Sequence, residues 1–298
     1  MSEISADRTT WGSMAYPGIE EINSDLVAGS PTVDVVIHYP SNLDRGHHEK
    51  VSPDLLIEGF RKSKEVFGAA DVQLKLVDMR SGWIDPSHFM IRSSQRDNDV
   101  PFGTFANMYI EAERHPAELS DEALDVFRAI VSPADNADRT VHLVVLQGVF
   151  MDYFEPVVES RVYQKQTIET SGLSFPGYMH GERIPRELRG VISITNLVRT
   201  DHSWKTVAHE LGHKLLNVSH EHREIDPGHE IHSDQGLMLY GQGTEIARGR
   251  EGRFHYERLH RSPFVYIQSE SGNRTYNDDY ASGGFYYDPI YDGVSVEF

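Results

Sequence analysis

Two histidines and a glutamate in one short segment have the types and spacing of a zinc hydrolase site. The segment reads His209-Glu210-Leu211-Gly212-His213. On a helix, His209 and His213 are one turn apart on the same face, so both imidazoles can bind one metal ion. Glu210 lies beside them, where a carboxylate can take a proton from a metal-bound water. We therefore predict a catalytic zinc site that includes these three residues.

A catalytic zinc ion takes a third protein ligand and keeps one position open for water. His220 is the first candidate, because Asn217 can adopt the left-handed conformation that ends a helix and a turn there would bring His220 back toward the metal. Glu230 is the second candidate, if a further helix begins near His229. The remaining candidates are His222, Asp226 and His229.

These residues resemble the signature of the metzincin metallopeptidases, His-Glu-x-x-His-x-x-Gly-x-x-His. The resemblance implies that His209, His213 and His220 hold the zinc ion and that Glu210 is the general base. In this chain the third histidine comes one residue later than in the family pattern, and Asn217 takes the place of the glycine at the turn. One extra residue rotates the exit of the helix by about 100°. The resemblance therefore requires that the turn absorb this residue.

A second part of the resemblance lies in Gly236-Leu-Met-Leu-Tyr-Gly241. In metzincins a methionine lies in a tight turn under the metal site, and in several branches a tyrosine two residues later reaches the metal or the transition state. Met238 and Tyr240 have this spacing, which implies that Met238 supports the site and that Tyr240 steadies the oxyanion. The alternative with Glu230 instead resembles the gluzincins, in which Asp234 would orient a zinc histidine.

The helix that must carry the histidines is indicated by an apolar stripe at three- and four-residue intervals. The stripe consists of Trp204, Val207, Ala208, Leu211 and Leu215. Asp201 and Ser203 are candidate N-caps of this helix. Residues 190–196, just upstream, are typical of a short buried strand. The stripe leaves the two histidines on its flank, so we expect them at the edge of a core.

The amino-terminal half predicts strands that alternate with helices. The expected strands are 33–39, 72–77 and 141–146, and the expected helices are about 52–69, with Ser52 as N-cap, and 120–131. This alternation implies a mixed, largely parallel sheet with packed helices, in an order similar to the upper subdomain of a metzincin. The region from Asp152 to Arg189 predicts a long loop and an edge strand beside the cleft, where a peptide could pair.

We predict an α/β (α+β) zincin-like fold, with a mixed twisted sheet, an active-site helix and a smaller, irregular C-terminal subdomain that contains the Met-turn. The 298 residues, 39% of them hydrophobic, can form one core. We expect a single catalytic domain, residues 1–298, with an upper part of about 30–217 and a lower part of about 218–298. The Tyr- and Asp-rich end from Thr275 to Phe298 is expected to pack across this domain, and calcium binding by its carboxylates is an alternative.

Charge and composition exclude several partners. The net charge is −18, from 46 acidic and 28 basic residues, which disfavours binding to nucleic acid or to an anionic membrane. The chain has no apolar stretch long enough to cross a bilayer, no amino-terminal secretory signal and no cysteine. We therefore expect a cytoplasmic protein, or one exported without a cleavable signal peptide, that acts on protein or peptide substrates.

The sequence as a whole favours a zinc-dependent metalloendopeptidase that hydrolyses peptide bonds with a zinc-activated water and Glu210 as general base. One alternative is a gluzincin-type peptidase or amidase with Glu230 as third ligand, or an aminopeptidase with the same zinc chemistry. The other is a catalytically silent binding protein that keeps the metal fold. Glu210 argues against the silent protein, because a purely structural zinc site has no use for a base.

Overall fold

The computed structural model describes residues 11–16, 18–94, 118–119, 121–132, 135–136, 138–156, 163–175, 184–218, 234–239, 243–249, 252 and 254–277. The larger of its two sheets contains β1 (Gly12–Ser13), β2 (Thr32–Pro40), β3 (Gln73–Gly82), β6 (Val141–Val145), β9 (Gly172–Leu173), β10 (Val191–Ile194), β11 (Tyr266–Gln268) and β12 (Arg274–Tyr276). The smaller sheet contains β4 (Met90–Ser94), β5 (Glu118–Leu119), β7 (Gly148–Pro156) and β8 (Tyr163–Thr170). The helices are α1 (Ile19–Ile22), α2 (Arg45–Lys50), α3 (Pro53–Gly68), α5 (Asp121–Ile130), α7 (Thr206–Leu216) and α8 (His255–His260), with 3-10 turns η1 (Pro86–His88), η4 (Arg186–Leu188) and η5 (Ser203–Lys205).

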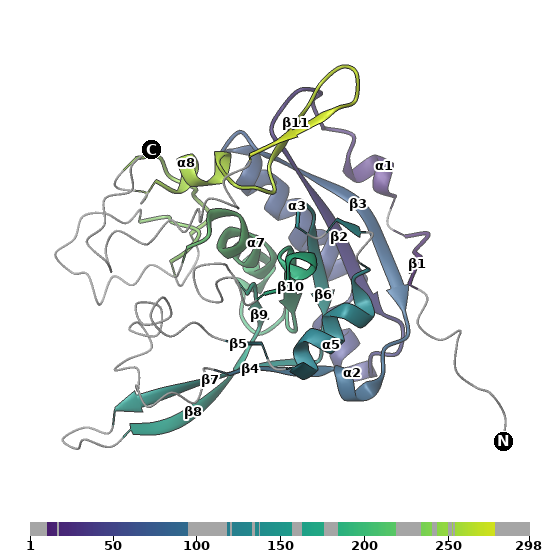
Figure 1. The fold of residues 1–298 in the computed structure, drawn as a ribbon, viewed down its shortest axis with the longest axis vertical. Coiled ribbons are helices and arrows are strands. Elements are labelled where there is room, and N and C mark those ends of the chain that lie inside the picture. The colour runs from purple at the N-terminus through teal and green to yellow at the C-terminus, as the bar shows by residue number, and fades with distance from the viewer. Residues whose placement is uncertain are drawn as a thin grey trace.

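The larger sheet is mixed and largely parallel, as the sequence predicts. Its strand order is β1-β3-β2-β6-β10-β9 (Figure 1). The four central strands, β3, β2, β6 and β10, are parallel to one another, whereas β1 runs antiparallel to β3 and β9 runs antiparallel to β10. Each expected strand of the amino-terminal half and the strand before α7 lie in this sheet, with boundaries within a few residues of those predicted.

The longest helix begins where the sequence predicts. The Ser52 side chain accepts a hydrogen bond of 3.2 Å from the backbone N–H of Leu55, and Pro53 occupies the first turn, where its missing N–H costs nothing. The apolar face of α3, which includes Phe60 and Phe67, is fully buried. It packs with α7 in one core, so α3 and the sheet together form the support for α7.

Alternation along the strands divides the buried side chains between two cores. Val35 and Ile37 of β2 point toward α3 and α7 and belong to the first core. Val144 of β6 points to the opposite face, where it packs with Phe127 of α5 and with Ile91 of β4 in the second core. Helices therefore cover both faces of the sheet, which explains why its central strands are buried almost throughout.

The region from Asp152 to Arg189 is more regular than the sequence predicts. The expected edge strand is present as β9, but the expected long loop contains the hairpin of β7 and β8, which extends away from the main body in Figure 1. The prediction of a loop was wrong because β8 has few apolar residues and no clear alternation. The strand conformation of β8 comes instead from its backbone pairing with β7, which runs from Val149↔Thr170 to Pro156↔Tyr163.

The carboxyl-terminal part of the described chain packs on the first long strand. Tyr266 of β11 pairs with Thr32 of β2, and the buried Asp34 carboxylate accepts hydrogen bonds from the Tyr266 hydroxyl at 2.8 Å and from Arg274 at 2.6 Å. Only residues 275–277 of the segment that was expected to pack across the domain are described, so its packing stays a prediction. The rest of that segment, with the carboxylates of the calcium alternative, lies outside the described residues.

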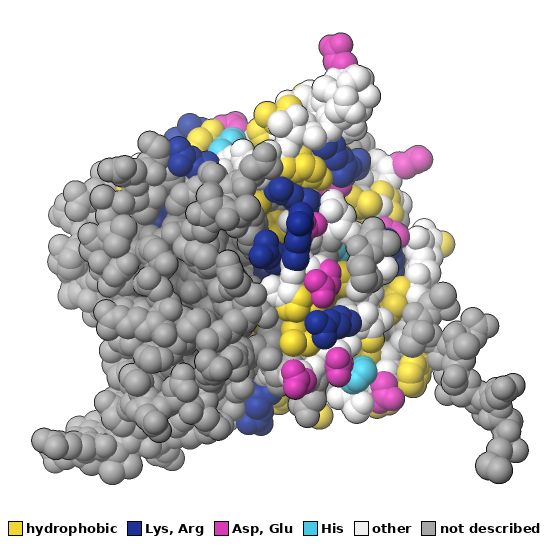
Figure 2. Space-filling model, viewed as in Figure 1, with side chains coloured by type: hydrophobic (Ala, Val, Ile, Leu, Met, Phe, Trp, Pro, Cys, Tyr) yellow, Lys and Arg dark blue, Asp and Glu magenta, His cyan; other side chains and the backbone are white. Residues whose placement is uncertain are grey.

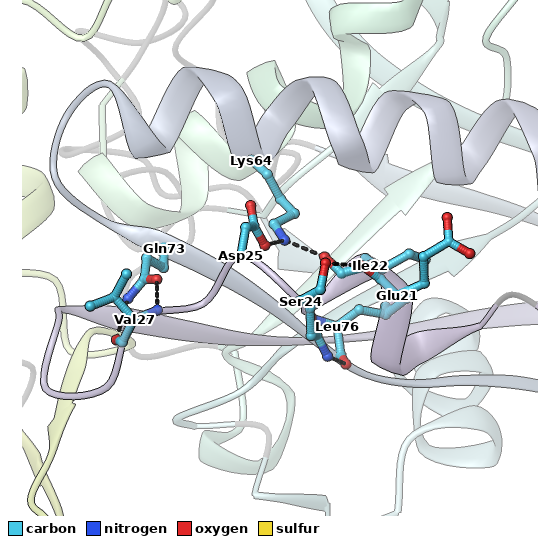
Figure 3. A network of polar contacts seen from close by, with 9 residues as sticks. Glu21, Ile22, Ser24, Asp25, Val27, Lys64, Gln73 and Leu76 are labelled. Carbon is cyan, nitrogen blue, oxygen red and sulfur yellow. Dashed lines mark hydrogen bonds and ion pairs between the residues drawn. The ribbon is translucent and has the colours of Figure 1, made fainter.

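A polar network fastens the segment between α1 and β2 to α3 and β3 (Figure 3). The ammonium group of Lys64 on α3 contacts the carbonyl of Ile22 and the carboxylate of Asp25. The Gln73 side chain exchanges two hydrogen bonds with the backbone of Val27, at 2.6 and 3.0 Å. These contacts hold the segment that follows α1 against α3 and β3.

The described surface carries charges of both signs. In Figure 2, Lys and Arg side chains are interspersed with Asp and Glu side chains over the part of the face that is not grey. No helix among the described residues is long and apolar enough to span a bilayer.

Candidate metal centre

The helix predicted to carry the motif is α7, and its stripe is buried as expected. Val207, Ala208, Leu211 and Leu215 are at most 2% exposed and belong to the first core. The fit against α3 is close, because a Cβ added at Gly59 would lie 2.9 Å from a methyl group of Val207. This packing leaves His209 half-buried and His213 buried, at the edge of the core.

The predicted N-caps of α7 are wrong. The helix is extended upstream by the 3-10 turn η5, whose backbone bonds include Lys205 N–H to the carbonyl of His202 at 3.1 Å. The Ser203 hydroxyl accepts a hydrogen bond from the backbone N–H of Thr200 at 2.8 Å, and no side chain caps α7. Asp201 is exposed in the preceding turn. A tighter turn thus satisfies donors that the prediction assigned to a cap.

Both motif histidines turn the same ring nitrogen toward a backbone carbonyl. Nδ1 of His209 lies 3.0 Å from the carbonyl oxygen of Leu237, and Nδ1 of His213 lies 2.7 Å from that of Val218. A carbonyl oxygen only accepts, so each Nδ1 carries the proton and each Nε2 carries the lone pair. Metal-binding histidines are commonly oriented in this way by a backbone carbonyl.

Burial keeps both rings neutral. Desolvation lowers the pKa of His209 to about 4 and lowers the pKa of His213 well below its usual value. A neutral imidazole is the form that binds a metal ion. The two rings lie with their centroids 4.7 Å apart at a near-perpendicular angle, so the pair is close without stacking.

The end of α7 follows the prediction for Asn217. This residue has φ 52° and ψ 52°, the left-handed conformation that asparagine tolerates better than most residues. The turn brings the carbonyl of Val218 back to Nδ1 of His213. The residue that ends the helix thus also helps to orient a candidate ligand.

Met238 lies in a turn that packs against α7, and its predicted role under a metal site stays a prediction. Met238 is fully buried, in a turn that Leu239 N–H closes on the carbonyl of Gly236 at 3.1 Å. A Cβ added at Gly212 would lie 2.6 Å from the sulfur of Met238 and 3.0 Å from a methyl group of Leu237. The glycine in the motif is therefore needed for the turn to approach the helix, and that approach places the Leu237 carbonyl against His209.

Glu210 is a buried carboxyl group without complete hydrogen bonding. It is 6% exposed, and its Oε2 has no hydrogen-bond partner within the described residues. Burial raises its pKa to about 8, against the opposing effect of the positive charge of Lys214. Buried carboxylates that serve structure are normally hydrogen-bonded, so this group fits a role in proton transfer better than a role in packing.

Two buried lysines hold α7 to the segments on either side of it. Nζ of Lys205 donates to the carbonyl of Gly243 at 3.1 Å, and Nζ of Lys214 donates to the carbonyls of Phe175 and Arg189 at 3.0 and 2.7 Å. Desolvation lowers the pKa of both ammonium groups. Neither residue was predicted to be buried, because a lysine is normally exposed and the motif does not indicate otherwise.

The candidates for a third ligand lie outside the described residues. His220, Glu230 and the other candidates fall within 219–233, and Tyr240 is also outside the described chain. Within the described residues, no group of three or more His, Cys, Asp or Glu is placed to hold a metal ion. Asp234, which the gluzincin alternative places on a helix, is exposed in a turn.

No protein-family model matches the chain, and no curated protein matches it.

Proposed function

We propose that this chain is a zinc-dependent metalloendopeptidase of metzincin-like architecture, in which His209, His213 and His220 hold the ion. The observation that carries the proposal is the shared orientation of the two motif histidines. Each Nδ1 is engaged by a backbone carbonyl, and each lone pair is therefore on Nε2. Two neutral imidazoles one helical turn apart form a donor set that suits zinc.

The neighbouring carboxyl group supports a catalytic role for the site. A zinc ion bound there would activate a water molecule and polarise the scissile carbonyl. Glu210 would take the proton of that water and deliver it to the leaving amine. Burial raises the pKa of this carboxyl group, which makes its protonated form a suitable donor to the leaving amine, and a bound cation would lower the pKa for the first step. By resemblance, Tyr240 would steady the oxyanion.

The edge strand β9 supports a peptide substrate. Among the described strands β9 is the last of the larger sheet, and it lies directly against Glu210, since a Cβ added at Gly172 would lie 2.7 Å from Cγ of Glu210. An extended peptide that pairs with an exposed sheet edge gains backbone hydrogen bonds independent of its sequence. A substrate paired with β9 would pass beside the carboxyl group.

His220 is favoured over Glu230 as the third ligand by the turn at Asn217. This turn redirects the chain only three residues before His220, and Val218 is already folded back on His213. The exposed position of Asp234 gives the gluzincin alternative no comparable support. An amidase or aminopeptidase remains the second enzymatic class, because the same zinc chemistry would serve a smaller substrate.

Cleavage of an unstructured protein tests this proposal. Wild-type protein is expected to cut at internal positions, whereas an aminopeptidase would release residues from the end of the chain. Glu210→Gln removes the base and keeps the size of the side chain, so hydrolysis should fall by roughly 10²–10⁴ or more while zinc content persists. Equal cleavage by wild type and the Gln variant would show that Glu210 is not the base, and a wild type without hydrolytic activity would favour the silent binding protein.

A further inference from the structure

Lys214 is the most unusual charged residue near the candidate site. It follows His213 directly and is 4% exposed. Among the described residues it forms no salt bridge, and its ammonium group instead donates to the carbonyls of Phe175 and Arg189. Burying an ammonium group is costly, and two hydrogen bonds to neutral carbonyls offset that cost only in part. On a helix, Lys214 lies one turn after Glu210 on the same face.

The carbonyl that Lys214 holds belongs to a residue in an uncommon conformation. Phe175 has φ 48°, in the left-handed region, where a bulky side chain is strained. Its ring is fully buried and meets the Phe127 ring edge-on at a centroid distance of 5.3 Å. Phe175 comes two residues after β9, so a contact that holds its carbonyl restrains the chain where it leaves the edge strand.

The edge strand is also in close contact with the carboxyl group on the same helix. A Cβ added at Gly172 would lie 2.7 Å from Cγ and 2.9 Å from Oε1 of Glu210. On its other side, β9 is fixed to the sheet by pairing with β10 and by the Ser193 hydroxyl, which donates to the carbonyl of Leu173 at 3.1 Å. The position of β9 therefore sets the space around Glu210.

We propose that Lys214 is a positioning residue, which holds the left-handed turn at Phe175 and thereby fixes the distance between β9 and Glu210. The proposal rests on the proposed function, since it assigns β9 to the substrate and Glu210 to proton transfer. Without the ammonium group, the strained turn relaxes and β9 shifts relative to the carboxyl group. The histidines are held by other contacts, the carbonyls of Leu237 and Val218, and keep their orientation.

The test compares Lys214→Met with Lys64→Met. Lys64 is also a largely buried lysine that holds a backbone carbonyl, but it lies on α3 and fastens the remote segment drawn in Figure 3. For each variant, zinc per chain, the midpoint of thermal unfolding, and kcat and KM per zinc-loaded molecule would be measured. Lys214→Met should keep its zinc, raise KM and lower kcat, with a total loss in kcat/KM of about 10²-fold. Lys64→Met should lower the unfolding midpoint and leave both kinetic constants as in wild type.

A purely structural role for Lys214 gives a different result. It would reduce the amount of folded protein and leave KM and kcat per zinc-loaded molecule unchanged, which would overturn the proposal. Lys214→Gln keeps an N–H donor and has no charge to bury, so it serves if the Met variant does not fold. It should change both constants in the same direction, by about 10-fold in kcat/KM, and unchanged constants in this variant would equally overturn the proposal.

Hydrogen exchange separates this inference from the proposed function. In metal-free protein, amides of residues 172–175 should exchange at least about 10-fold faster in the Lys214 variant than in wild type, and Lys64→Met should not affect them. If wild type hydrolyses no peptide, the proposed function fails while this measurement still tests the anchor. Wild-type exchange at residues 172–175 in the Lys214 variant would show that the turn does not depend on the ammonium group.

Discussion

The described part of the chain contains two close pairs of buried or half-buried histidines, and they differ in how their ring nitrogens are used. In the sheet, Nε2 of His38 on β2 lies 2.9 Å from Nδ1 of His142 on β6, and Nε2 of His142 lies 3.4 Å from the carbonyl oxygen of Asp135. The carbonyl only accepts, so His142 donates from Nε2 and accepts at Nδ1 from His38. One nitrogen of each ring is thus used in the contact between the two rings, and Nε2 of His142 is used by Asp135. Nδ1 of His38 keeps a lone pair and has no hydrogen-bond partner among the described residues.

The pair on α7 is arranged in the opposite way. His209 and His213 do not bond to each other through Nδ1, because each Nδ1 is turned to a carbonyl, of Leu237 and of Val218. In both rings the lone pair is therefore on Nε2, the nitrogen that would bind a metal ion. Proximity of two histidines is common to both regions, and the direction of the second nitrogen is what distinguishes a candidate metal site from a structural pair.

The largest expected effect concerns the ligand that the α7 pair needs and the sheet pair does not. His220→Ala should remove one of three ligands and lower zinc affinity by several powers of ten, well beyond the roughly 10–100-fold effect of outer-shell changes. Glu230→Ala should leave the affinity nearly unchanged. Zinc titration of both variants decides between them, and loss of zinc in the Glu230 variant alone would move the protein to the gluzincin class.

A smaller effect is expected where packing orients the α7 pair. Gly212→Ala places a methyl group 2.6 Å from the sulfur of Met238 and should lower the free energy of unfolding by about 1–3 kcal/mol. It should also weaken zinc binding about 10-fold, because the Leu237 carbonyl that orients His209 must move.

Gly68→Ala is the matched control for that substitution. Gly68 is also a helical glycine, the last residue of α3, but a Cβ there meets nothing within 4 Å, so alanine should stabilise the fold by about 0.5–1 kcal/mol. Chemical denaturation of both variants gives the two values. Equal stability of the Gly212 and Gly68 variants would show that Met238 does not depend on the close approach to α7.

The last effect is the pH dependence that the sheet pair contributes. Desolvation, the charge of Arg80 and the mutual proximity of the rings lower the pKa of His38, and desolvation lowers that of His142 to about 4. The unfolded state, with a pKa near 6.5, therefore binds more protons, so stability is present above about pH 6.5 and is lost as the pH falls toward 4.

Denaturation of metal-free protein at several pH values measures this contribution. The loss is expected to be roughly 1.4 kcal/mol per pH unit for each such histidine. His142→Gln removes one of the two titrating rings and should make the pH dependence shallower by about that amount. The Trp11 ring also contacts His38 edge-on, and the His142 variant leaves this contact in place. The same slope in wild type and variant would contradict a neutral, buried pair.

Local sequence signals predicted much of the fold and part of the site. Ser52 and Asn217 behave as predicted because capping and left-handed turns depend on the residue itself and its nearest neighbours. The alternation of β3 likewise depends on adjacent residues, which is why this strand was predictable from the sequence. The predicted roles of the residues between 219 and 233 stay predictions.

Contacts between distant parts of the chain were not predictable from one sequence. His38 and His142 are 104 residues apart, and neither belongs to a motif. The burial of Lys214 depends on the carbonyl of Phe175, which is 39 residues away in sequence. The close approach of Gly172 to Glu210 likewise depends on the folded chain. Asp201 and Ser203 were misassigned because the choice between a capped helix and a leading 3-10 turn depends on the surrounding backbone.

The central claim, that the α7 pair binds a metal ion and the sheet pair does not, is tested most directly by zinc content. The proteins to compare are wild type, His213→Asn and His142→Asn, purified without chelators and measured by elemental analysis. We expect about one zinc per chain in wild type and in the His142 variant, and loss of tightly held zinc in the His213 variant. A wild type without tightly held transition metal, or zinc lost from the His142 variant and kept by the His213 variant, would contradict the account.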